Sequence, residues 1–241
     1  MRDNVPGEFS KSGIKHLEPS DDIKGCVVDI EMLTQSYLDG HPITGGSVDP
    51  AHFTKAVSDW HIDLPSRFND FRTFKRQIEW LAGRVAFSAL DEKYFGGGHQ
   101  IAYIEGGAPC IESLPNPVSI THAGKYAAAA ISLRNDIVVG IDIERIKEFP
   151  HKESFFRVAF PEEDQSYLST LTNDEIMLLW TLKESFLKIV KKGFADRLKD
   201  VKIHTDHFIY KGKAIDDLKR NSYTFDNHIL SFIYGNLSSL S

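Results

Sequence analysis

The amino-acid sequence predicts an α+β fold made of two similar α/β halves, each a small antiparallel sheet packed on a long helix. Two observations lead to this prediction. The tripeptide Asp-Ile-Glu occurs twice on strand-like segments, at residues 29–31 and 142–144, and each half of the chain carries one long helical segment with a cluster of basic residues and glutamate. This duplicated order suits two halves packed side by side better than one doubly wound sheet.

The composition is that of an ordinary globular protein. The chain has 241 residues, 41% of them hydrophobic, which is enough for one compact unit or two closely packed halves. The net charge of −6 argues against general nucleic-acid binding, because that mode of binding needs a basic surface. We therefore expect no nucleic-acid partner.

Neither the cysteines nor the apolar segments indicate a secreted or membrane protein. Cys26 and Cys110 lie far apart and outside any Cys/His cluster, so the sequence predicts neither a disulfide framework nor a zinc site. Residues 1–8 carry charges and a proline where a signal peptide would need an apolar run. The longest apolar stretch, residues 127–131, is far shorter than the roughly 20 residues that span a bilayer. We expect a soluble, cytoplasmic monomer without a membrane segment.

Polar residues with several glycines and prolines predict an extended or partly ordered arm over residues 1–22. The N-terminal half should then cover residues 23–134. Its first element is a predicted strand at residues 25–33, where β-branched and apolar residues dominate. A loop rich in glycine and proline follows at residues 40–50 and should lie on the surface.

The next predicted element is a long helix that starts at about residue 69 and ends near Tyr94. Its apolar residues recur at spacings of three and four, as in one buried helical stripe, and a triple glycine at residues 96–98 stops it. Short strands are expected at residues 101–104 and 118–121.

A hairpin is predicted where residues 126–133 and 137–143 flank the short polar turn Arg134-Asn135-Asp136. The C-terminal half should cover residues 135–241. Its long helix begins at the capping box Thr172-Asn173-Asp174-Glu175 and ends at Lys191-Lys192-Gly193, and its last strand is expected at residues 228–234.

The segment Gly140-Ile141-Asp142-Ile143-Glu144 offers the clearest candidate site. On a strand, Asp142 and Glu144 project to one face, so two carboxylates can supply the oxygen ligands that Mg²⁺ prefers. An isolated Asp-x-Glu is more often the solvated face of a half-buried strand. We interpret Asp29 and Glu31, which have the same spacing without accompanying motifs, as structural.

Three further segments combine reactive residue types. Trp180, Glu184 and Lys188 are spaced by four and share one helical stripe. Arg76 and Arg84 are two turns apart and lie roughly on one side of the first long helix, and His122 follows a predicted strand. Each segment alone has an ordinary structural explanation. Trp180 could be a core residue, and Glu184 with Lys188 could be a surface ion pair. The two arginines could face solvent, and His122 could be an ordinary loop residue.

The four segments follow one another in this order: Arg76-x-x-Glu79-Trp80-Leu81-Ala82-Gly83-Arg84, Ser119-x-Thr121-His122, Gly140-Ile141-Asp142-Ile143-Glu144 and Trp180-x-x-Lys183-Glu184-Ser185-x-x-Lys188. Together they resemble the large phosphopantetheinyl transferases of the surfactin and enterobactin type, whose two halves form a pseudodimer. The resemblance spans about residues 64–194. It also matches Glu163 to an acidic residue that follows an aromatic run.

The resemblance implies an enzyme, a holo-[acyl-carrier-protein] synthase. Such an enzyme moves the 4′-phosphopantetheine arm of coenzyme A to a serine of an apo acyl or peptidyl carrier protein and releases 3′,5′-ADP. The implied cofactor is Mg²⁺, held by Asp142, Glu144 and Glu184. The implied catalytic residues are Glu144, Glu184 and Lys188, and either glutamate could take the serine proton.

For coenzyme A the resemblance implies that Arg76, Arg84 and His122 bind phosphates and that Lys188 binds the pyrophosphate. Ala108 departs from the family, because many members carry a basic residue before the following proline. An acidic carrier would need a local basic patch, for which Lys191 and Lys192 are candidates. Two other functions stay open, a Mg²⁺-dependent phosphohydrolase and a non-catalytic protein that binds coenzyme A or a carrier.

Overall fold

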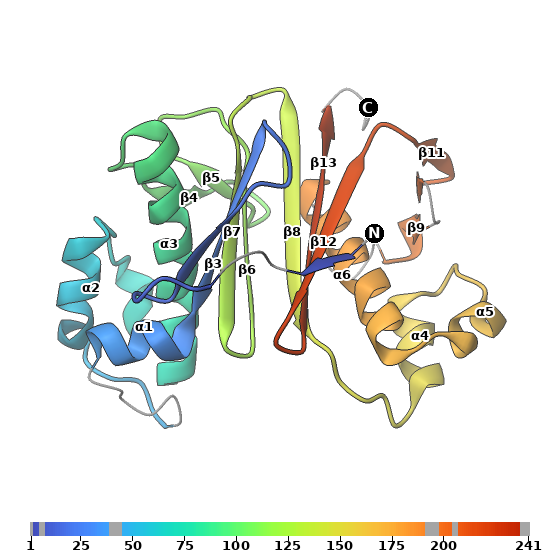
Figure 1. The fold of residues 1–241 in the computed structure, drawn as a ribbon, viewed down its shortest axis with the longest axis horizontal. Helices are drawn as coiled ribbons and strands as arrows, with labels where there is room; N and C mark the ends of the chain where they lie inside the picture. Colours follow the sequence, from blue (N-terminus) through green and yellow to red (C-terminus); the bar gives the residue numbers. More distant parts are fainter. Residues whose placement is uncertain (1, 5–7, 39–44, 191–197, 204–206, 237–241) are drawn as a thin grey trace.

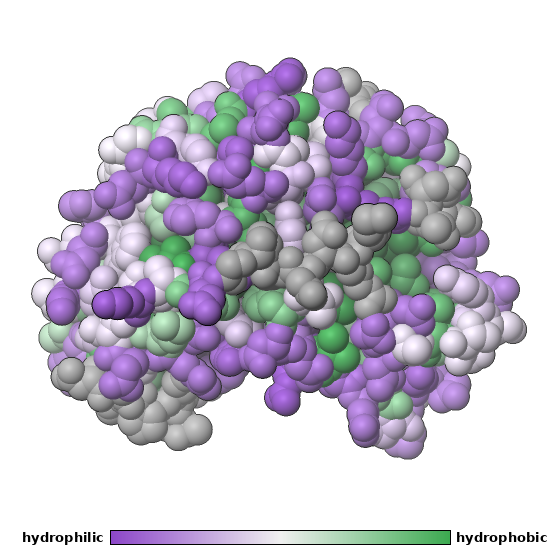
Figure 2. Space-filling view, in the orientation of Figure 1, coloured by the Kyte–Doolittle hydropathy of each residue, from purple (hydrophilic) through white to green (hydrophobic). Residues whose placement is uncertain are grey.

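The protein is built around two facing four-stranded sheets, each covered on its outer side by one long helix (Figure 1). The described residues also form one three-stranded and one two-stranded sheet. The computed structural model describes residues 2–4, 8–38, 45–190, 198–203 and 207–236. The prediction of a mixed α and β fold with small antiparallel sheets is confirmed. Within the described ranges, every helix is too short or too polar to cross a lipid bilayer. The face shown in Figure 2 is mostly hydrophilic, with small groups of hydrophobic atoms between.

The N-terminal half is built on a four-stranded antiparallel sheet with the order β2-β3-β7-β6. Its helix α3 packs on the outer face. The elements of this half are β2 (Ile14–Leu17), β3 (Ile23–Asp29), α1 (Ile30–Tyr37), α2 (Thr54–Asp59), α3 (Phe74–Phe95), β4 (Ile101–Tyr103), β5 (Pro109–Ile111), β6 (Val118–Ala123) and β7 (Tyr126–Ser132), with 3-10 turns at Pro50–Phe53 and Ser66–Asp70.

The C-terminal half has a second four-stranded sheet with the order β1-β12-β13-β8, and α6 covers its outer face. The helices α4 and α5 pack beside α6. The elements of this half are β8 (Ile137–Arg145), α4 (Lys152–Ala159), α5 (Gln165–Thr170), α6 (Asn173–Ile189), β9 (Val201–Ile203), β10 (Phe208–Tyr210), β11 (Lys213–Ile215), β12 (Lys219–Phe225) and β13 (His228–Asn236), with a 3-10 turn at Leu198–Asp200; the strand β1 (Arg2–Asn4) comes from the start of the chain.

Strand alternation explains the layers. On β7, Ala127 and Ala129 face α3, whereas Ala128 and Ala130 belong to the core between the two sheets. On β8, Ile141 and Ile143 face that same central core, which leaves the intervening residues to face α6. The predicted orientation of the apolar side of this strand is therefore confirmed.

The predicted hairpin between residues 126–133 and 137–143 is wrong. Strand β7 pairs with β3 and β6 in one sheet, and β8 pairs with β13 in the other. The polar turn at residues 134–136 therefore leads from one sheet to the next. Strand β7 has a neighbouring strand on each edge, and all seven of its residues are buried. The residues of the following turn do not specify which strands pair with it.

Hydroxyl groups join β6 to β8 where a backbone ladder would otherwise run. The amide of Ile141 donates to Ser119 Oγ at 3.1 Å, and the amide of Ile143 donates to Thr121 Oγ1 at 3.4 Å. These bonds satisfy edge donors of β8 without merging the two sheets. They also fix β6 of the N-terminal half against the strand that carries the carboxylates.

The predicted arm over residues 1–22 contains paired strands. Residues 2–4 form β1, which pairs in parallel with β12 of the C-terminal sheet. Residues 14–17 form β2, which pairs with β3 of the N-terminal sheet. The start of the chain therefore contributes a strand to each half, a pairing between distant segments that the local composition does not indicate.

The predicted strand at residues 25–33 ends earlier than expected. Asp29 ends β3 and caps α1, because its Oδ1 accepts hydrogen bonds from the amides of Glu31 and Met32 at 2.9 and 3.1 Å. The structural interpretation of Asp29 is thus confirmed, although Asp29 and Glu31 do not share a strand.

Helix α3 follows its predicted stop signal, and α6 follows its predicted start signal. The predicted end of α6 at Lys191-Lys192-Gly193 lies outside the described residues. Helix α3 begins at Phe74 rather than near residue 69, because Thr73 caps it and residues 66–70 form a separate 3-10 turn. It ends at Phe95, and Gly96 adopts φ 90°, a left-handed conformation that glycine permits. The predicted capping box of α6 is confirmed, with Thr172 and Glu175 as its members.

We expect Thr172→Ala to lower the free energy of unfolding by about 1 kcal/mol, because the variant loses the side-chain bond to the first turn of α6. Urea denaturation monitored by circular dichroism measures this change. Thr170→Ala is the matched control, since Thr170 is exposed and bonds only locally, to the carbonyl of Tyr167. Equal stability of the Thr172 variant and the wild type would contradict the prediction.

Candidate functional site

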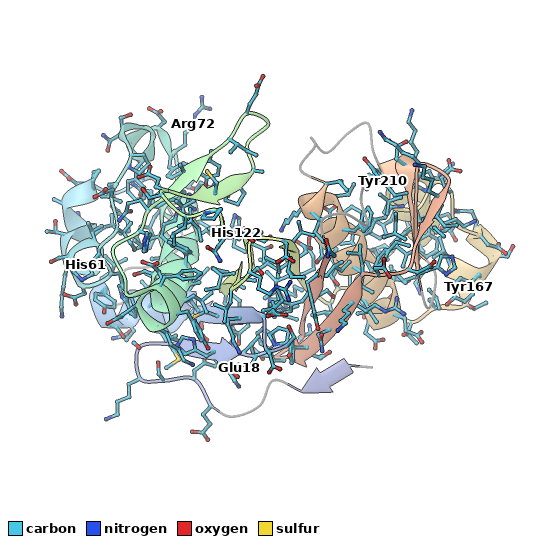
Figure 3. All side chains as sticks on the ribbon, turned by 90° about the horizontal axis from the view of Figure 1, so that it is seen from above. Glu18, His61, Arg72, His122, Tyr167 and Tyr210 are labelled. Atoms are coloured by element: carbon cyan, nitrogen blue, oxygen red, sulfur yellow. The ribbon has the colours of Figure 1, made fainter. Side chains whose placement is uncertain are left out.

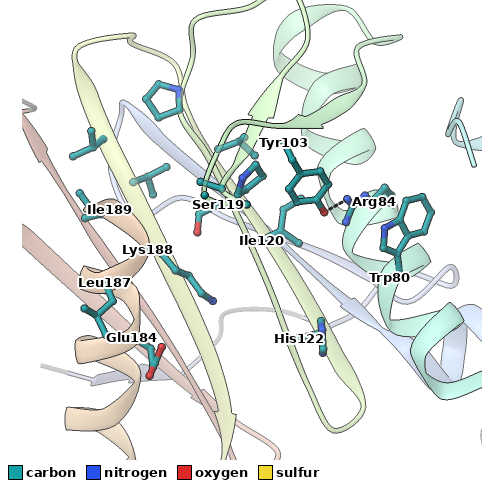
Figure 4. A pocket seen from close by; sticks show the side chains of 18 of the residues that line it. Trp80, Arg84, Tyr103, Ser119, Ile120, His122, Glu184, Leu187, Lys188 and Ile189 are labelled. Carbon is teal, nitrogen blue, oxygen red and sulfur yellow. Dashed lines mark hydrogen bonds between the residues drawn. The ribbon is translucent and has the colours of Figure 1, made fainter. Parts of the chain in front are cut away.

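A cavity of about 390 Å³ opens between the two halves (Figure 4). Helix α3 and strand β6 of the N-terminal half form one wall, and α6 with β8 forms the other. Seen from above, His122 lies at the junction of the two halves (Figure 3). The polar and aromatic side chains that line this cleft are Arg76, Glu79, Trp80, Arg84, Tyr103, Ser119, His122, Glu184 and Lys188.

Arg84 is held between two aromatic rings. Its guanidinium carbon lies 4.4 Å from the Trp80 ring centre and 5.4 Å from the Tyr103 ring centre, and it donates a hydrogen bond to the Tyr103 hydroxyl. The side chain is buried, so the rings fix a cation whose charge is poorly screened by solvent. Such a fixed cation suits recognition of a phosphate group.

Arg76 and His122 form a second basic group on the same wall. Arg76 Nη1 lies 2.8 Å from His122 Nε2, and Glu79 lies beneath both side chains. Burial lowers the pKa of His122, with Arg76 adding to this effect and Glu79 opposing it. Arg76 and Arg84 both line the cleft, as expected from their spacing of two helical turns.

The opposite wall joins a strand and a helix in direct contact. Lys188 Nζ on α6 donates to Asp142 Oδ1 at 2.9 Å and to the carbonyl of Ile141 at 2.8 Å, both on β8. Gly140 makes this approach possible, because a Cβ atom there would lie 2.0 Å from the carbonyl oxygen of Ser185. The predicted strand face and helix stripe therefore meet directly.

Three carboxylates gather at this contact. Burial and then the nearby Asp142 raise the pKa of Glu184 to about 8. The same two causes raise the pKa of Glu144, while a hydrogen bond from Trp180 opposes the shift. The carboxylates repel one another in a poorly solvated place, which is the situation that a bound cation would relieve.

The donor atoms fit a magnesium ion. Asp142 Oδ2 and Glu184 Oε1 are buried and have no hydrogen-bond partner among the described residues. As they stand, no three His, Cys, Asp or Glu side chains of the described ranges are grouped closely enough to hold an ion. Because Mg²⁺ commonly takes one or two carboxylates and keeps water and substrate phosphates in its shell, a pair of free carboxylate oxygens suits it.

The cleft brings together Arg76, Arg84, His122, Glu184 and Lys188. The other two predicted site residues are not among the residues that line it. Asp142 is buried and accepts a hydrogen bond from Lys188. Glu144 is half-buried and lies two residues further along β8. The proposed carrier contacts Lys191 and Lys192 lie outside the described residues.

Two residues of the segment from Trp180 to Lys188, Lys183 and Ser185, hold α6 in place. Lys183 is fully buried, and its Nζ donates to both carboxylate oxygens of Glu163 at 3.1 and 3.3 Å. Burial lowers the pKa of Lys183, and Glu163 opposes that shift. Ser185 donates to the carbonyl of Ser231 on β13 at 3.0 Å. These two residues anchor α6, whereas Glu184 and Lys188 face the site.

Three groups at the site received no role from the sequence. Glu79 lies under Arg76 and His122, Tyr103 closes over Arg84, and Thr121 Oγ1 donates to Asp142 Oδ1 at 3.0 Å. The spacing of Glu79 three residues after Arg76 could have indicated an ion pair on α3. Tyr103 belongs to the β4–β5 hairpin. Because it is far from Arg84 along the chain, the sequence does not indicate the contact between these two side chains.

Comparison with known proteins agrees with the site. A sequence profile for the 4′-phosphopantetheinyl transferase superfamily matches residues 138–232. The chain is 34% identical over 107 residues to 4′-phosphopantetheinyl transferase ffp of Bacillus subtilis, which covers 42% of this chain and 46% of the relative. It is 33% identical over 109 residues to 4′-phosphopantetheinyl transferase Sfp of Bacillus subtilis strain 168, with the same coverage of 42% and 46%.

A third relative, a 4′-phosphopantetheinyl transferase of Bacillus subtilis, is 32% identical over 133 residues, or 50% of this chain and 58% of the relative. The chain thus spans about half the length of the curated relatives it matches. The matched profile covers the strand and helix that carry Asp142, Glu184 and Lys188. Residues 138–232, which carry these three side chains, are therefore similar to the 4′-phosphopantetheinyl transferase superfamily.

Proposed function

We propose that this protein transfers the 4′-phosphopantetheine group of coenzyme A to a serine hydroxyl of an apo acyl or peptidyl carrier protein and releases 3′,5′-ADP. One observation carries the proposal: a single cleft is lined by Arg76, Arg84 and His122 on one wall and by Glu184 and Lys188 on the other. Cations opposite a carboxylate group suit a substrate that carries several phosphates and reacts at one of them.

In this proposal the first wall binds the nucleotide part of coenzyme A. Arg84, fixed by its two aromatic neighbours, and Arg76 with His122 bind phosphates of the 3′,5′-ADP portion. Lys188 reaches the pyrophosphate from the other wall. Its bonds to Asp142 and to the Ile141 carbonyl hold the ammonium group at the cleft.

Asp142, Glu144 and Glu184 would hold Mg²⁺, which would supply positive charge to the phosphoryl oxygens during the reaction. The serine oxygen attacks the phosphorus nearest pantetheine, a new P–O bond forms, and the bond to the bridging oxygen of the pyrophosphate breaks. The 3′,5′-ADP leaves with the bonding electron pair. Lys188 offsets the negative charge that develops on the leaving oxygens.

A carboxylate takes the proton of the serine hydroxyl. Of the two candidates, Glu184 is favoured over Glu144 because Glu184 lines the cleft and Glu144 does not. The pseudodimeric relation of the two halves and the cytoplasmic, monomeric state of the protein stay predictions from the sequence.

The test is incubation of the protein with coenzyme A, Mg²⁺ and an apo carrier protein, followed by intact-protein mass spectrometry. We expect the carrier to gain one phosphopantetheine group, and a carrier whose acceptor serine is replaced by alanine to gain none. Failure with several unrelated carriers would contradict the proposal. Release of phosphate without an adduct would instead favour the phosphohydrolase, and coenzyme A binding without either reaction would favour the binding protein.

A further inference from the structure

Glu79 is a buried carboxylate in a wall that should bind phosphates. Its side chain is only 6% exposed, whereas those of Lys75 and Arg76 are 59% and 52% exposed. A buried negative charge in an anion site needs an explanation, because by itself it would repel the ligand. The side chains around Glu79 explain why this charge is tolerated.

Three basic side chains surround Glu79. Lys75 Nζ lies 2.5 Å from Glu79 Oε1, while Arg76 Nη1 and His122 Nδ1 lie 3.9 and 3.6 Å from Oε2. Lys75 and Arg76 come from the same helix, at spacings of four and three, and His122 comes from β6. The one carboxylate therefore ties helix α3 to the strand that carries the histidine.

The arrangement also assigns the proton of the imidazole. A guanidinium can only donate hydrogen bonds, so His122 Nε2 accepts from Arg76 Nη1 across their 2.8 Å contact. In a neutral ring the proton must then lie on Nδ1, the nitrogen that faces Glu79 Oε2. Glu79 and Arg76 thus hold opposite sides of the same ring.

We propose that Glu79 is a positioning residue that orients Arg76 for phosphate binding, both directly and through the His122 ring. The inference rests on the proposed function for the identity of the ligand. The ion-pair partners of Glu79 are Lys75, Arg76 and His122, and none of them is a proposed metal ligand. Through this carboxylate, the wall binds anions by a fixed geometry as well as by its net positive charge.

Whether Glu79→Gln weakens or tightens the binding of 3′,5′-ADP shows whether Glu79 positions other residues or acts only through its charge. If Glu79 acted only as a negative charge near the ligand, Glu79→Gln would remove repulsion and tighten the binding of 3′,5′-ADP. If Glu79 orients Arg76, directly and through the His122 ring, the same variant leaves the guanidinium free to turn away from the ligand and weakens that binding.

The experiment is calorimetric titration of 3′,5′-ADP into the full chain. We expect Glu79→Gln to raise Kd by about tenfold, the order expected when a charge-assisted contact is lost. Glu79→Asp keeps the charge at a shorter reach and should give an intermediate Kd. Glu92→Gln, an exposed glutamate of the same helix, is the matched control and should leave Kd unchanged. An unchanged or lower Kd in folded Glu79→Gln would overturn the inference.

A second measurement needs no ligand. Nitrogen-15 NMR of the histidine side chains in the wild-type protein reports which nitrogen of His122 is protonated, with His122→Gln used to assign the signal. We expect the tautomer protonated on Nδ1, and a ring protonated on Nε2 alone would overturn the inference. Failure of the wild type to bind 3′,5′-ADP would count against the proposed function, and the tautomer would still decide the role of Glu79.

Discussion

Asp142→Asn should lower kcat/KM for transfer to a carrier protein by at least about a hundredfold. Asp142 Oδ1 accepts hydrogen bonds from Thr121 and Lys188, and its buried Oδ2 has no partner among the described residues. The amide keeps the shape of the side chain, but it removes the negative charge that would attract Mg²⁺ and that holds the Lys188 ammonium group.

Two measurements check this prediction. Steady-state assays with coenzyme A and an apo carrier give kcat/KM, and calorimetric titration of Mg²⁺ into the free protein shows whether the variant still binds the ion. Asp136→Asn is the matched control, because Asp136 is an exposed turn residue of the same type, paired with Arg134 on the surface. An Asp142 variant with nearly wild-type activity would discard the proposed metal site and leave the transfer function standing.

Gly140→Ala should destabilise the fold by about 3 kcal/mol or more, near the upper end of overpacking changes. A Cβ atom at this position would lie 2.0 Å from the Ser185 carbonyl oxygen and 2.9 Å from Ile189 Cγ1. The oxygen belongs to the backbone of α6, so the clash cannot be relieved by a side-chain rotation. The helix must move away from β8, and Glu184 and Lys188 must move with it.

Urea denaturation gives the change in the free energy of unfolding, and the transfer assay reports whether the surviving folded protein is active. We expect both stability and activity to fall. Gly46→Ala serves as the control, because a Cβ atom at Gly46 would have no neighbour within 4 Å. Its expected effect is within about 0.5 kcal/mol. If Gly140→Ala changed the free energy of unfolding as little as this control, α6 and β8 would not be packed as closely as described.

The sequence predicted much of the local structure at the site. Alternation on β8 correctly separated Asp142 from Ile141 and Ile143, because a strand turns successive side chains to opposite faces. The spacing of four on α6 correctly predicted that Glu184 and Lys188 share a stripe. Both inferences depend only on residues within one element, whose geometry the backbone fixes.

Predictions that required pairing between distant segments fared worse. The turn at residues 134–136 looks like a hairpin turn, yet β7 and β8 belong to different sheets. The composition of the first 22 residues predicted an extended or partly ordered arm and did not indicate that two of its segments pair with a different sheet each. A strand edge can pair with several others of similar composition, and the choice depends on which cores are buried together.

The sequence by itself therefore determined which reactive groups lie together within each motif, because residue type and spacing set which groups share a face of one strand or helix. Only the tertiary structure decided which faces meet. It set Lys188 directly on Asp142, where Gly140 allows the closest approach, and put Glu79 beneath Arg76 and His122. These contacts join segments far apart in the chain, and they follow from how the sheets and helices pack as layers rather than from any local period.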